Sequence, residues 1–380
     1  MIHITKKEQC CGCNACVQVC PVACIEMKVD LEGFYYPVVE QIDKCIKCGK
    51  CERVCPCLNK QAENTPLLTF AVQSNQEELR RQSSSGGFFT ELSLWVLQQQ
   101  GVVFGARFTK EWTVAHAYTE TVDGLAYFRG SKYVQSHLGD SFKQVKAFLQ
   151  AGRWVLFSGT SCQIAALSLF LKTKPERLLT VEVVCHGVPS ERIWRSYLME
   201  LTDQSVSKIT DIDFRNKKTG WKNYSFVCNW QTHRIQEVHK QNNYMKAYLS
   251  DSLLRPVCYH CPSKSFAAGS DFTLADYWGV HSLQPELDDD LGIGIAFVHT
   301  SKAQQVLDLL PIAKYPLSAS FEQIVRYNHS IAKPVNPPLR LKRYLFYVGL
   351  SFHLPFSFMV NILLKKRGII GWFKHIGRKG

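Results

Sequence analysis

A run of cysteines that occurs twice near the N-terminus constrains the fold more than any other feature of the sequence. The first copy reads Cys-x2-Cys-x2-Cys-x3-Cys-Pro from Cys10 to Pro21, and the second reads the same from Cys45 to Pro56, with an offset of 35 residues. Three thiolates two residues apart surround one iron–sulfur cubane, while a short helix carries the fourth thiolate away and the proline ends that helix. The repeat therefore predicts two [4Fe–4S] clusters.

The two copies are expected to exchange their fourth ligands, because the last cysteine of each run in a ferredoxin-type domain binds the other cluster. We predict such a domain for residues 1–62, with a strand and its turn at 33–40 between the halves. Zinc knuckles, the alternative, would place two ligand pairs far apart. Cys11, Cys24 and Cys57 lie outside the repeat and are expected to pack as small apolar side chains. The first cluster is assigned to Cys10, Cys13, Cys16 and Cys55, and the second to Cys20, Cys45, Cys48 and Cys51.

The distribution of cysteine also excludes a disulfide scaffold. Eleven of the 16 cysteines lie within residues 10–57, whereas such a scaffold needs bridges throughout the chain. The N-terminal residues contain no apolar run and no small-residue cleavage site, so we expect a cytoplasmic protein whose reduced thiols bind metal. The formal charge of +13 comes mostly from the C-terminal tail, and no nucleic-acid-binding signature is present. We therefore expect no nucleic-acid partner.

Strand and helix patterns alternate through residues 66–335, after a polar linker at 59–66. Strands separated by helices indicate βαβ units and a mixed or parallel sheet. The predicted fold class is thus a small ferredoxin domain followed by a mixed α/β domain, with the chemistry at loops that leave the carboxyl ends of the strands. Expected strands lie at 68–72, 102–108, 154–157 and 179–184, and expected helices at 88–100, 162–171 and 189–201.

Two loops that precede predicted helices are suited to anions. Ser83–Gly87 reads SSSGG, and its backbone N–H groups, hydroxyls and helix dipole can hold a phosphate. Serine-rich helix caps also occur without any ligand, which is the alternative for this loop. Ser158–Cys162 reads SGTSC and adds a thiol in the first turn of a helix, where thiolate is favoured.

Four cysteines of the body form a further candidate ligand set. Cys162 and Cys185 each follow a predicted strand, and Cys258 and Cys261 form a CxxC in a turn. Spacing alone leaves three alternatives open, namely a third [4Fe–4S] cluster, a zinc ion or scattered thiols. Cys228 lies in an alternating, strand-like stretch and is expected in the core.

Six motifs follow one another along the body. They are SSSGG (83–87), GSKYVQS (130–136), SGTSCQIAAL (158–167), VCHGVPS (184–190), FRNKKTGW (214–221) and CYHCPSKSFAAGSDFTLADYWG (258–279). In this order they resemble the beta-subunit family of coenzyme F420 hydrogenases and dehydrogenases over residues 66–335. A two-cluster ferredoxin domain commonly precedes this family's domain. The resemblance implies an FAD as the reacting centre and an iron–sulfur cluster in the same domain.

The resemblance also implies roles for single residues. Lys132 is expected to pair with a phosphate of the flavin and Tyr133 to cover its ring. His186 is a candidate proton donor, with a satisfied structural histidine as the alternative. The implied ligands of the third cluster are Cys162, Cys185, Cys258 and Cys261. The implied flavin-binding residues are Ser85, Gly86, Gly87, Lys132 and Tyr133. The implied catalytic and substrate-side residues are His186, Arg215, Asp276 and Trp221.

The C-terminal tail, residues 336–380, is both basic and apolar. Residues 340–380 hold nine Lys or Arg and no Asp or Glu, and the 21 residues at 344–364 carry no charge. This length would span a bilayer, but an internal proline and basic residues on both sides favour helices at the surface of an anionic membrane. Helices packed on the body or on a partner are the third alternative.

These features predict a flavin-dependent iron–sulfur oxidoreductase that moves electrons between ferredoxin-type clusters and an organic substrate or coenzyme through FAD. The expected partners are a low-potential electron donor or acceptor such as ferredoxin, an unidentified organic substrate, and the inner face of a membrane at residues 340–380. The resemblance also suggests a place in surface-polysaccharide biosynthesis. The alternatives are an electron-relay subunit that feeds a separate partner at the membrane, and a scaffold.

Overall fold

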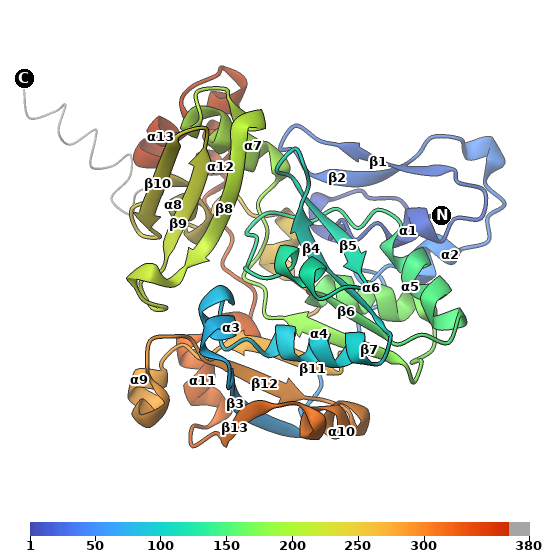
Figure 1. Cartoon of the computed structure of the whole chain (residues 1–380). Helices are drawn as coiled ribbons and strands as arrows, with labels where there is room; N and C mark the ends of the chain where they lie inside the picture. The colour runs from blue at the N-terminus through green and yellow to red at the C-terminus, as the bar shows by residue number, and fades with distance from the viewer. Residues whose placement is uncertain (365–380) are drawn as a thin grey trace, which may run out of the picture.

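The N-terminal cysteine repeat forms a small domain at one end of the chain in the computed structural model, which describes residues 1–364 (Figure 1). Two antiparallel strands separate the halves, and the second of them confirms the strand expected at 33–40. The third cysteine of each run sits in a single helical turn that begins after a residue with positive φ, Asn14 or Gly49. The elements are α1 (Ala15–Gln18), β1 (Ile25–Val29), β2 (Tyr35–Val39) and α2 (Lys50–Arg53), with 3-10 turns η1 (Lys7–Gln9) and η2 (Ile42–Lys44).

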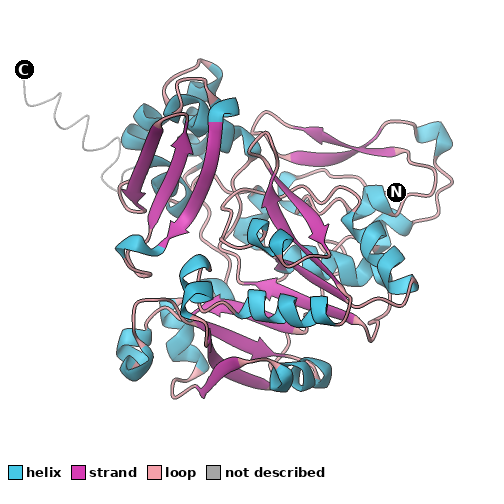
Figure 2. Cartoon of the chain, in the orientation of Figure 1, coloured by secondary structure: helices cyan, strands magenta, loops and turns pink. Residues whose placement is uncertain are grey.

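An eight-stranded mixed sheet is the centre of the body (Figure 2). Its strands are β3 (Leu68–Ser74), β4 (Val102–Phe108), β5 (Val114–Thr119), β6 (Val155–Thr160), β7 (Leu178–Val183), β11 (Phe272–Asp276), β12 (Gly294–Val298) and β13 (Ile312–Pro316). The order is β13-β3-β12-β11-β7-β6-β4-β5. Neighbours among β4, β6, β7 and β11 are parallel, whereas the outer pairs are antiparallel. The mixed α/β fold predicted from the sequence is therefore confirmed.

Helices cover both faces of this sheet. On one face α4 and α10 bury apolar side chains against β4, β6 and β7, and on the other α5 and α6 pack between the sheet and the N-terminal domain. The helices expected at 88–100 and 162–171 are confirmed as α4 and α6. The helices are α3 (Glu77–Gln82), α4 (Phe88–Gln98), α5 (Ser141–Gln150), α6 (Ser161–Leu171), α9 (Val280–Leu283), α10 (Ser301–Leu309) and α11 (Phe321–Tyr327), with 3-10 turns η3 (Asp123–Tyr127), η6 (Pro256–His260), η7 (Pro285–Leu287) and η8 (His329–Ile331).

A second, three-stranded antiparallel sheet forms a separate lobe, at the upper left in Figure 1. Its central strand carries Cys228, which is fully buried as expected. The helix expected at 189–201 is confirmed as α7 and packs here. The elements are α7 (Glu191–Leu201), β8 (Ile209–Asn216), β9 (Ser225–Trp230), β10 (His233–Val238) and α8 (Asn243–Leu249), with 3-10 turns η4 (Val206–Lys208) and η5 (Lys217–Thr219).

The first part of the C-terminal tail packs on this lobe. α12 (Arg340–Ser351), α13 (Phe356–Met359) and the turn η9 (Val360–Leu364) bury Phe346 and Phe356 against the aromatic side chains of α7 and α8. No helix within residues 1–364 is long and apolar enough to cross a membrane. The basic residues of the tail after position 364, on which part of the membrane prediction depends, lie outside the described residues.

The N-terminal domain is docked against both lobes of the body. At its hairpin turn, Glu32 receives two hydrogen bonds from Arg343 of α12, at 2.9 and 2.7 Å, and its carbonyl accepts from Ser190 Oγ at 2.6 Å. On the other side, Cys11 and Cys13 share an apolar cluster with α5, α6 and η6 of the body. These contacts place the first cysteine run beside the carboxyl edge of the main sheet.

Candidate functional site

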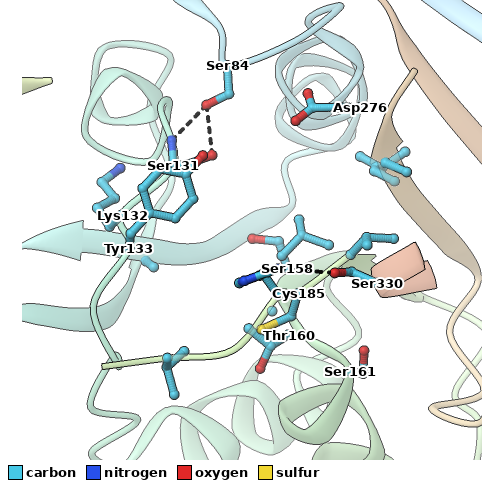
Figure 3. Close-up of a pocket in the computed structure, with 18 of the residues that line it drawn as sticks. Ser84, Ser131, Lys132, Tyr133, Ser158, Thr160, Ser161, Cys185, Asp276 and Ser330 are labelled. Carbon is cyan, nitrogen blue, oxygen red and sulfur yellow. Dashed lines mark hydrogen bonds between the residues drawn. The ribbon is translucent and has the colours of Figure 1, made fainter. Parts of the chain in front are cut away.

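The carboxyl ends of the central parallel strands open into one large cavity (Figure 3). Its volume is about 620 Å³, which lies in the range of pockets that hold cofactors and other small molecules. All of the body residues with an expected role in the site, except Trp221, line it. They are Ser85, Gly86, Gly87, Lys132, Tyr133, Cys162, Cys185, His186, Arg215, Cys258, Cys261 and Asp276.

The SSSGG loop runs along one wall of the cavity and leads directly into α4. A Cβ at Gly86 would lie 2.3 Å from the carbonyl oxygen of Val72, and Gly87 has a φ of +90°, so the loop needs glycine at both positions. Among residues 1–364, no protein group accepts a hydrogen bond from the backbone N–H of Ser85, Gly86 or Gly87. Unpaired N–H groups at the start of a helix form a binding site for an anion such as a phosphate.

The second motif, at residues 130–136, is tied to this loop. Ser84 Oγ accepts hydrogen bonds from the backbone N–H of Ser131 at 2.7 Å and from its hydroxyl at 3.0 Å, as the dashed lines in Figure 3 show. The ring of Tyr133 stacks on Tyr248, with centroids 4.6 Å apart. The cavity therefore has an aromatic wall in addition to the SSSGG loop.

Lys132 lines the cavity, but its ammonium is engaged by the protein. Nζ donates to the carbonyl oxygens of Tyr127 at 2.9 Å and Arg129 at 2.8 Å. Burial lowers the pKa of Lys132 to about 7. A contact with phosphate would require this side chain to leave its present partners, and the role expected for Lys132 stays a prediction.

Arg215 and Asp276 form a buried ion pair on the cavity wall, with Nη1 and Oδ2 2.9 Å apart. The same Nη1 donates to Tyr133 Oη at 3.1 Å, and Nη2 donates to the carbonyl of Ser84 at 3.1 Å. The Nε–H of Arg215 has no partner among the described residues. Buried donors of this kind are normally satisfied, so the site suits a ligand with an acceptor atom. Trp221 supports the loop from behind by donating from Nε1 to the Ser84 carbonyl at 3.2 Å.

The four cysteines of the body gather along another part of the cavity wall. In the β6–β7 ladder Thr160 pairs with Val183, so the two strands end together and present Cys162 and Cys185 at one edge. The turn η6 brings Cys258 and Cys261 to the same place, since both sense the charge of the other two thiols. Burial raises the pKa of Cys185 to about 11 and that of Cys261 to about 12.

These thiols do not converge on a point. Within residues 1–364, no three His, Cys, Asp or Glu side chains lie close enough to hold a single metal ion. A zinc site needs such convergence, whereas the thiolates of a cubane each bind a different iron and stand farther apart. The donor set is thus chemically suited to an iron–sulfur cluster.

The N-terminal domain contributes Cys11 and Cys13 to the wall of the same cavity. A hydrogen bond with the Cys11 thiol and burial together raise the pKa of Cys162 well above its ordinary value. Cys11 therefore lies at the contact between the first cysteine run and the body ligand set. The sequence offered no signal for this contact, because the packing prediction treats Cys11 as an ordinary buried residue.

The structure brings cysteines of the two runs near one another, and the crossed assignment of the cluster ligands stays a prediction. Burial and then the neighbouring thiols of Cys10 and Cys55 raise the pKa of Cys16, so the last cysteine of the second run lies with the first. Cys20 stands beside Cys24, with their sulfur atoms 3.6 Å apart, and Cys24 in turn contacts Cys45.

His186 is engaged at both ring nitrogens. Nε2 bonds to a carboxylate oxygen of Asp251, and Nδ1 lies 3.3 Å from Ser330 Oγ. The geometry is that of a satisfied histidine with an orienting carboxylate. Nδ1 must leave Ser330, or Nε2 must leave Asp251, before that nitrogen can reach a molecule in the cavity.

Two cations of the site were missed by the sequence analysis. Lys264, three residues after the CxxC, donates to the carbonyl oxygens of Cys185 and Ser330, the latter at 2.7 Å. Arg255, three residues before the CxxC, contacts the first cysteine run. Cationic residues next to a thiol pair favour thiolate. Their closeness in sequence to the CxxC is the one signal that could have identified Lys264 and Arg255 as residues of the site.

Comparison with known proteins agrees with the sequence motifs. Residues 152–317 match the family model for the C terminus of the coenzyme F420 hydrogenase/dehydrogenase beta subunit, so the resemblance expected from the sequence is confirmed over this segment. A chain of the F420-reducing [NiFe] hydrogenase complex from Methanosarcina barkeri is 16% identical with a TM-score of 0.49, over 71% of this chain and 90% of that chain. No curated protein matches the sequence.

Proposed function

We propose that this protein is an iron–sulfur flavoprotein oxidoreductase, with FAD in the large cavity, one [4Fe–4S] cluster beside it and two more in the N-terminal domain. One observation supports this more than any other. A single cavity joins an anion-binding loop at a helix N-terminus to four cysteines that come from three separate elements. The hydrogenase and dehydrogenase family that matches residues 152–317 is one of oxidoreductases, which agrees with this proposal.

The chain's own groups fit a flavin dinucleotide. The free N–H groups of Ser85, Gly86 and Gly87 suit its pyrophosphate, and the orphan Nε–H of Arg215 suits a carbonyl or ring nitrogen acceptor. The Tyr133–Tyr248 pair supplies an apolar wall, and the buried surroundings exclude water. When bound, a flavin takes up two electrons together and releases them one at a time to iron–sulfur centres.

The route for electrons follows the contact between the two parts of the chain. Cys10 belongs to the first cysteine run, its neighbour Cys11 touches Cys162, and Cys162 belongs to the body set. This sequence of contacts links the N-terminal domain to the cavity without an intervening layer of protein. A low-potential partner such as ferredoxin would exchange electrons at the N-terminal domain, and an organic substrate or coenzyme would react in the cavity.

The polar groups that remain in the cavity orient such a substrate. Asp276 and Arg215 fix each other and offer the Arg215 Nε–H, and His186 with Asp251 is the group best placed to supply a proton. The resemblance adds surface-polysaccharide biosynthesis as the setting. A relay subunit without chemistry of its own would share the same cofactors but not turn over a substrate.

Cofactor content tests the proposal. Protein isolated without oxygen should contain about one flavin and about twelve irons per chain, and dithionite or reduced ferredoxin should bleach both chromophores. Absence of flavin after anaerobic reconstitution contradicts the proposal. An iron content near eight per chain contradicts only the cluster proposed for the body. Substrate turnover by the isolated chain then separates an enzyme from a relay.

A second proposal concerns the outer face of α12. Leu341, Tyr344 and Phe352 lie exposed along this helix, and Phe352 is 76% exposed. Arg340 and Lys342 flank them. An apolar stripe with a basic rim suits the surface of an anionic membrane.

Vesicle binding tests this contact. Phe352→Ser should lower the fraction of protein that sediments with phosphatidylserine vesicles, since it removes the most exposed apolar side chain of the stripe. Leu309→Ser is the matched control, because Leu309 on α10 is 66% exposed but lies away from the stripe. Equal losses in both variants, or no sedimentation of the unaltered protein, contradict the proposal. Deletion of the whole tail is a poor test because α12 and α13 also complete the core.

A further inference from the structure

A buried arginine joins the N-terminal domain to the body. Arg255 is 0% exposed and directly precedes η6, the turn that carries Cys258. Its backbone N–H donates to the carbonyl of Val188 at 2.8 Å, in the loop that carries Cys185. Arg255 is therefore fixed to two of the three segments that present the body cysteines, those of Cys185 and Cys258.

The guanidinium of Arg255 extends from the body into the first cysteine run. Nε donates to the carbonyl of Cys10 at 2.7 Å, and Nη2 donates to the carbonyl of Tyr35 at 2.8 Å and lies 3.6 Å from Cys10 Sγ. Nη1 donates to Gln135 Oε1 at 3.0 Å. A Cβ at Gly12 would lie 2.8 Å from Nη1. The loop that carries the first cysteines is thus folded around this cation.

No carboxylate in residues 1–364 pairs with Arg255. The two other buried arginines each have one, since Arg80 binds Asp289 at 2.7 Å and Arg215 binds Asp276 at 2.9 Å. A buried cation without a counter-ion is strongly unfavourable. The ionisable groups that surround Arg255 are the thiols of Cys10, Cys11 and Cys258 and the phenol of Tyr36.

The anions that balance this charge are cysteine thiolates, because a thiol that binds a metal is deprotonated. We propose that Arg255 is the counter-cation of the cluster held by Cys10 and raises the reduction potential of that cluster above that of the second N-terminal cluster. The inference rests on the proposed N-terminal clusters. Arg255 touches a ligand and not the substrate, so it acts as a positioning residue.

The second cysteine run also has an arginine beside it, at a different position of the repeat. Arg53 donates to the carbonyl of Cys48, which corresponds to Cys13, at 2.7 Å, and its Nη1 would lie 3.0 Å from a Cβ at Gly49, which corresponds to Asn14. Arg53 is exposed, so water and salt screen its charge. The charge of Arg255 acts in a dry interior, where it stabilises the added electron of a reduced cluster far more strongly.

The proposed difference in reduction potential between the two N-terminal clusters gives electron flow a direction. Cys11, next to Cys10, contacts Cys162 of the body, so the cluster with the higher potential is the one nearer the cavity. An electron that enters at the second cluster moves toward the body. Arg255 therefore links the contact between the N-terminal domain and the body to the free energy of electron transfer.

A redox titration of the full chain, followed by electron paramagnetic resonance without oxygen, tests this inference. In Arg255→Met one N-terminal wave should move to lower potential by at least a tenfold change in the reduction equilibrium, which is about 59 mV for a one-electron couple. The other wave should stay in place. Arg255→Lys keeps the charge and should keep most of the potential, and Arg53→Met should leave both waves within the error of the titration.

If neither N-terminal wave changes its potential in Arg255→Met, the inference is wrong. It is also wrong if Arg53→Met shifts a wave by the same amount as Arg255→Met. If Arg255→Met does not assemble its first cluster, full iron in Arg255→Lys supports the counter-charge and equal depletion in both variants overturns it. Absence of N-terminal clusters in the unaltered protein is instead a failure of the proposed function, and it is seen before any variant is made.

Discussion

The two sets of cysteines reach their positions by opposite routes. In the N-terminal domain three of the ligands proposed for each cluster lie in one short loop, where Gly12 and Gly49 take positive φ values that let the backbone turn tightly. In the body, Cys162 and Cys185 come from the ends of two strands, and Cys258 comes from a turn that Arg255 holds in place. A ligand set encoded locally survives disturbance elsewhere, whereas one assembled by tertiary structure depends on the whole fold.

Single cysteine replacements give the largest expected effects. Cys13→Ala and Cys258→Ala should each lose about four irons per chain, the first from the local set and the second from the tertiary set. Elemental analysis after anaerobic purification measures the loss. Cys228→Ala is the control, because Cys228 is fully buried in β9 and lies in neither set. Unchanged iron in Cys258→Ala contradicts the tertiary set.

A glycine replacement separates the flavin from the clusters. Gly87→Ala places a Cβ 2.6 Å from Leu79 Cδ2 at a φ of +90°, which costs about 1–2 kcal/mol in backbone strain alone and displaces the N–H groups of the loop. Bound flavin should fall severalfold while iron stays constant. Gly269→Ala controls for the strain, since Gly269 also has positive φ but has nothing within 4 Å of its Cβ position. Equal loss of flavin in both variants would mean that the SSSGG loop has no specific role in flavin binding.

The docking of the two regions is tested at Glu32 and Arg343. Arg343→Met leaves the Glu32 carboxylate half-buried without its partner and should lower the free energy of unfolding by about 2 kcal/mol. Urea unfolding followed by cluster absorbance measures this. Arg195→Met, which removes an exposed pair with Glu191, should change it by less than about 0.5 kcal/mol. A matching small change in Arg343→Met would mean that the domain is held by its apolar contacts alone.

The last expected effect, no larger than that of Arg343→Met, is a dependence of the stability of the body on pH. Burial lowers the pKa of His299 to about 4, so between pH 6.5 and pH 4 the unfolded chain binds a proton that the folded chain does not. Stability is complete above pH 6.5 and falls as the pH decreases, by about 2 kcal/mol between pH 7 and pH 5. His299→Gln keeps a hydrogen-bonding side chain near Thr273 and should show a shallower decrease in melting temperature. Parallel decreases in both proteins would assign the acid sensitivity to other groups.

Local patterns predicted much of the fold. The strand at 102–108 and the helices at 88–100 and 162–171 are visible because each apolar run begins directly after a glycine or serine, and the cysteine repeat fixes its own domain by spacing. The pairing in the outer half of the main sheet was not predicted, although the strand expected at 68–72 is present as β3. β3 pairs with β12 and β13, which come more than two hundred residues later, and pairing over such distances leaves no local signal.

The sequence predicted which residues lie at the site but not which partners their side chains bind. The body residues with an expected cofactor or catalytic role, except Trp221, meet at one cavity, yet the direction of Lys132 is decided by the carbonyl oxygens of Tyr127 and Arg129. The direction of the Arg255 side chain is likewise decided by its partners, among them the carbonyl oxygen of Cys10 in the N-terminal domain. A side chain's partners depend on tertiary placement, which neither spacing nor motif order contains.

The contact between Glu32 and Arg343 has a consequence for how the protein matures. The two residues are 311 positions apart, so synthesis of the first is long complete before the second leaves the ribosome. The body residues that cover Cys10 and Cys11, such as Gln135 and Arg255, are made before Arg343. The contact between Glu32 and Arg343 is therefore the last part of this interface that can form.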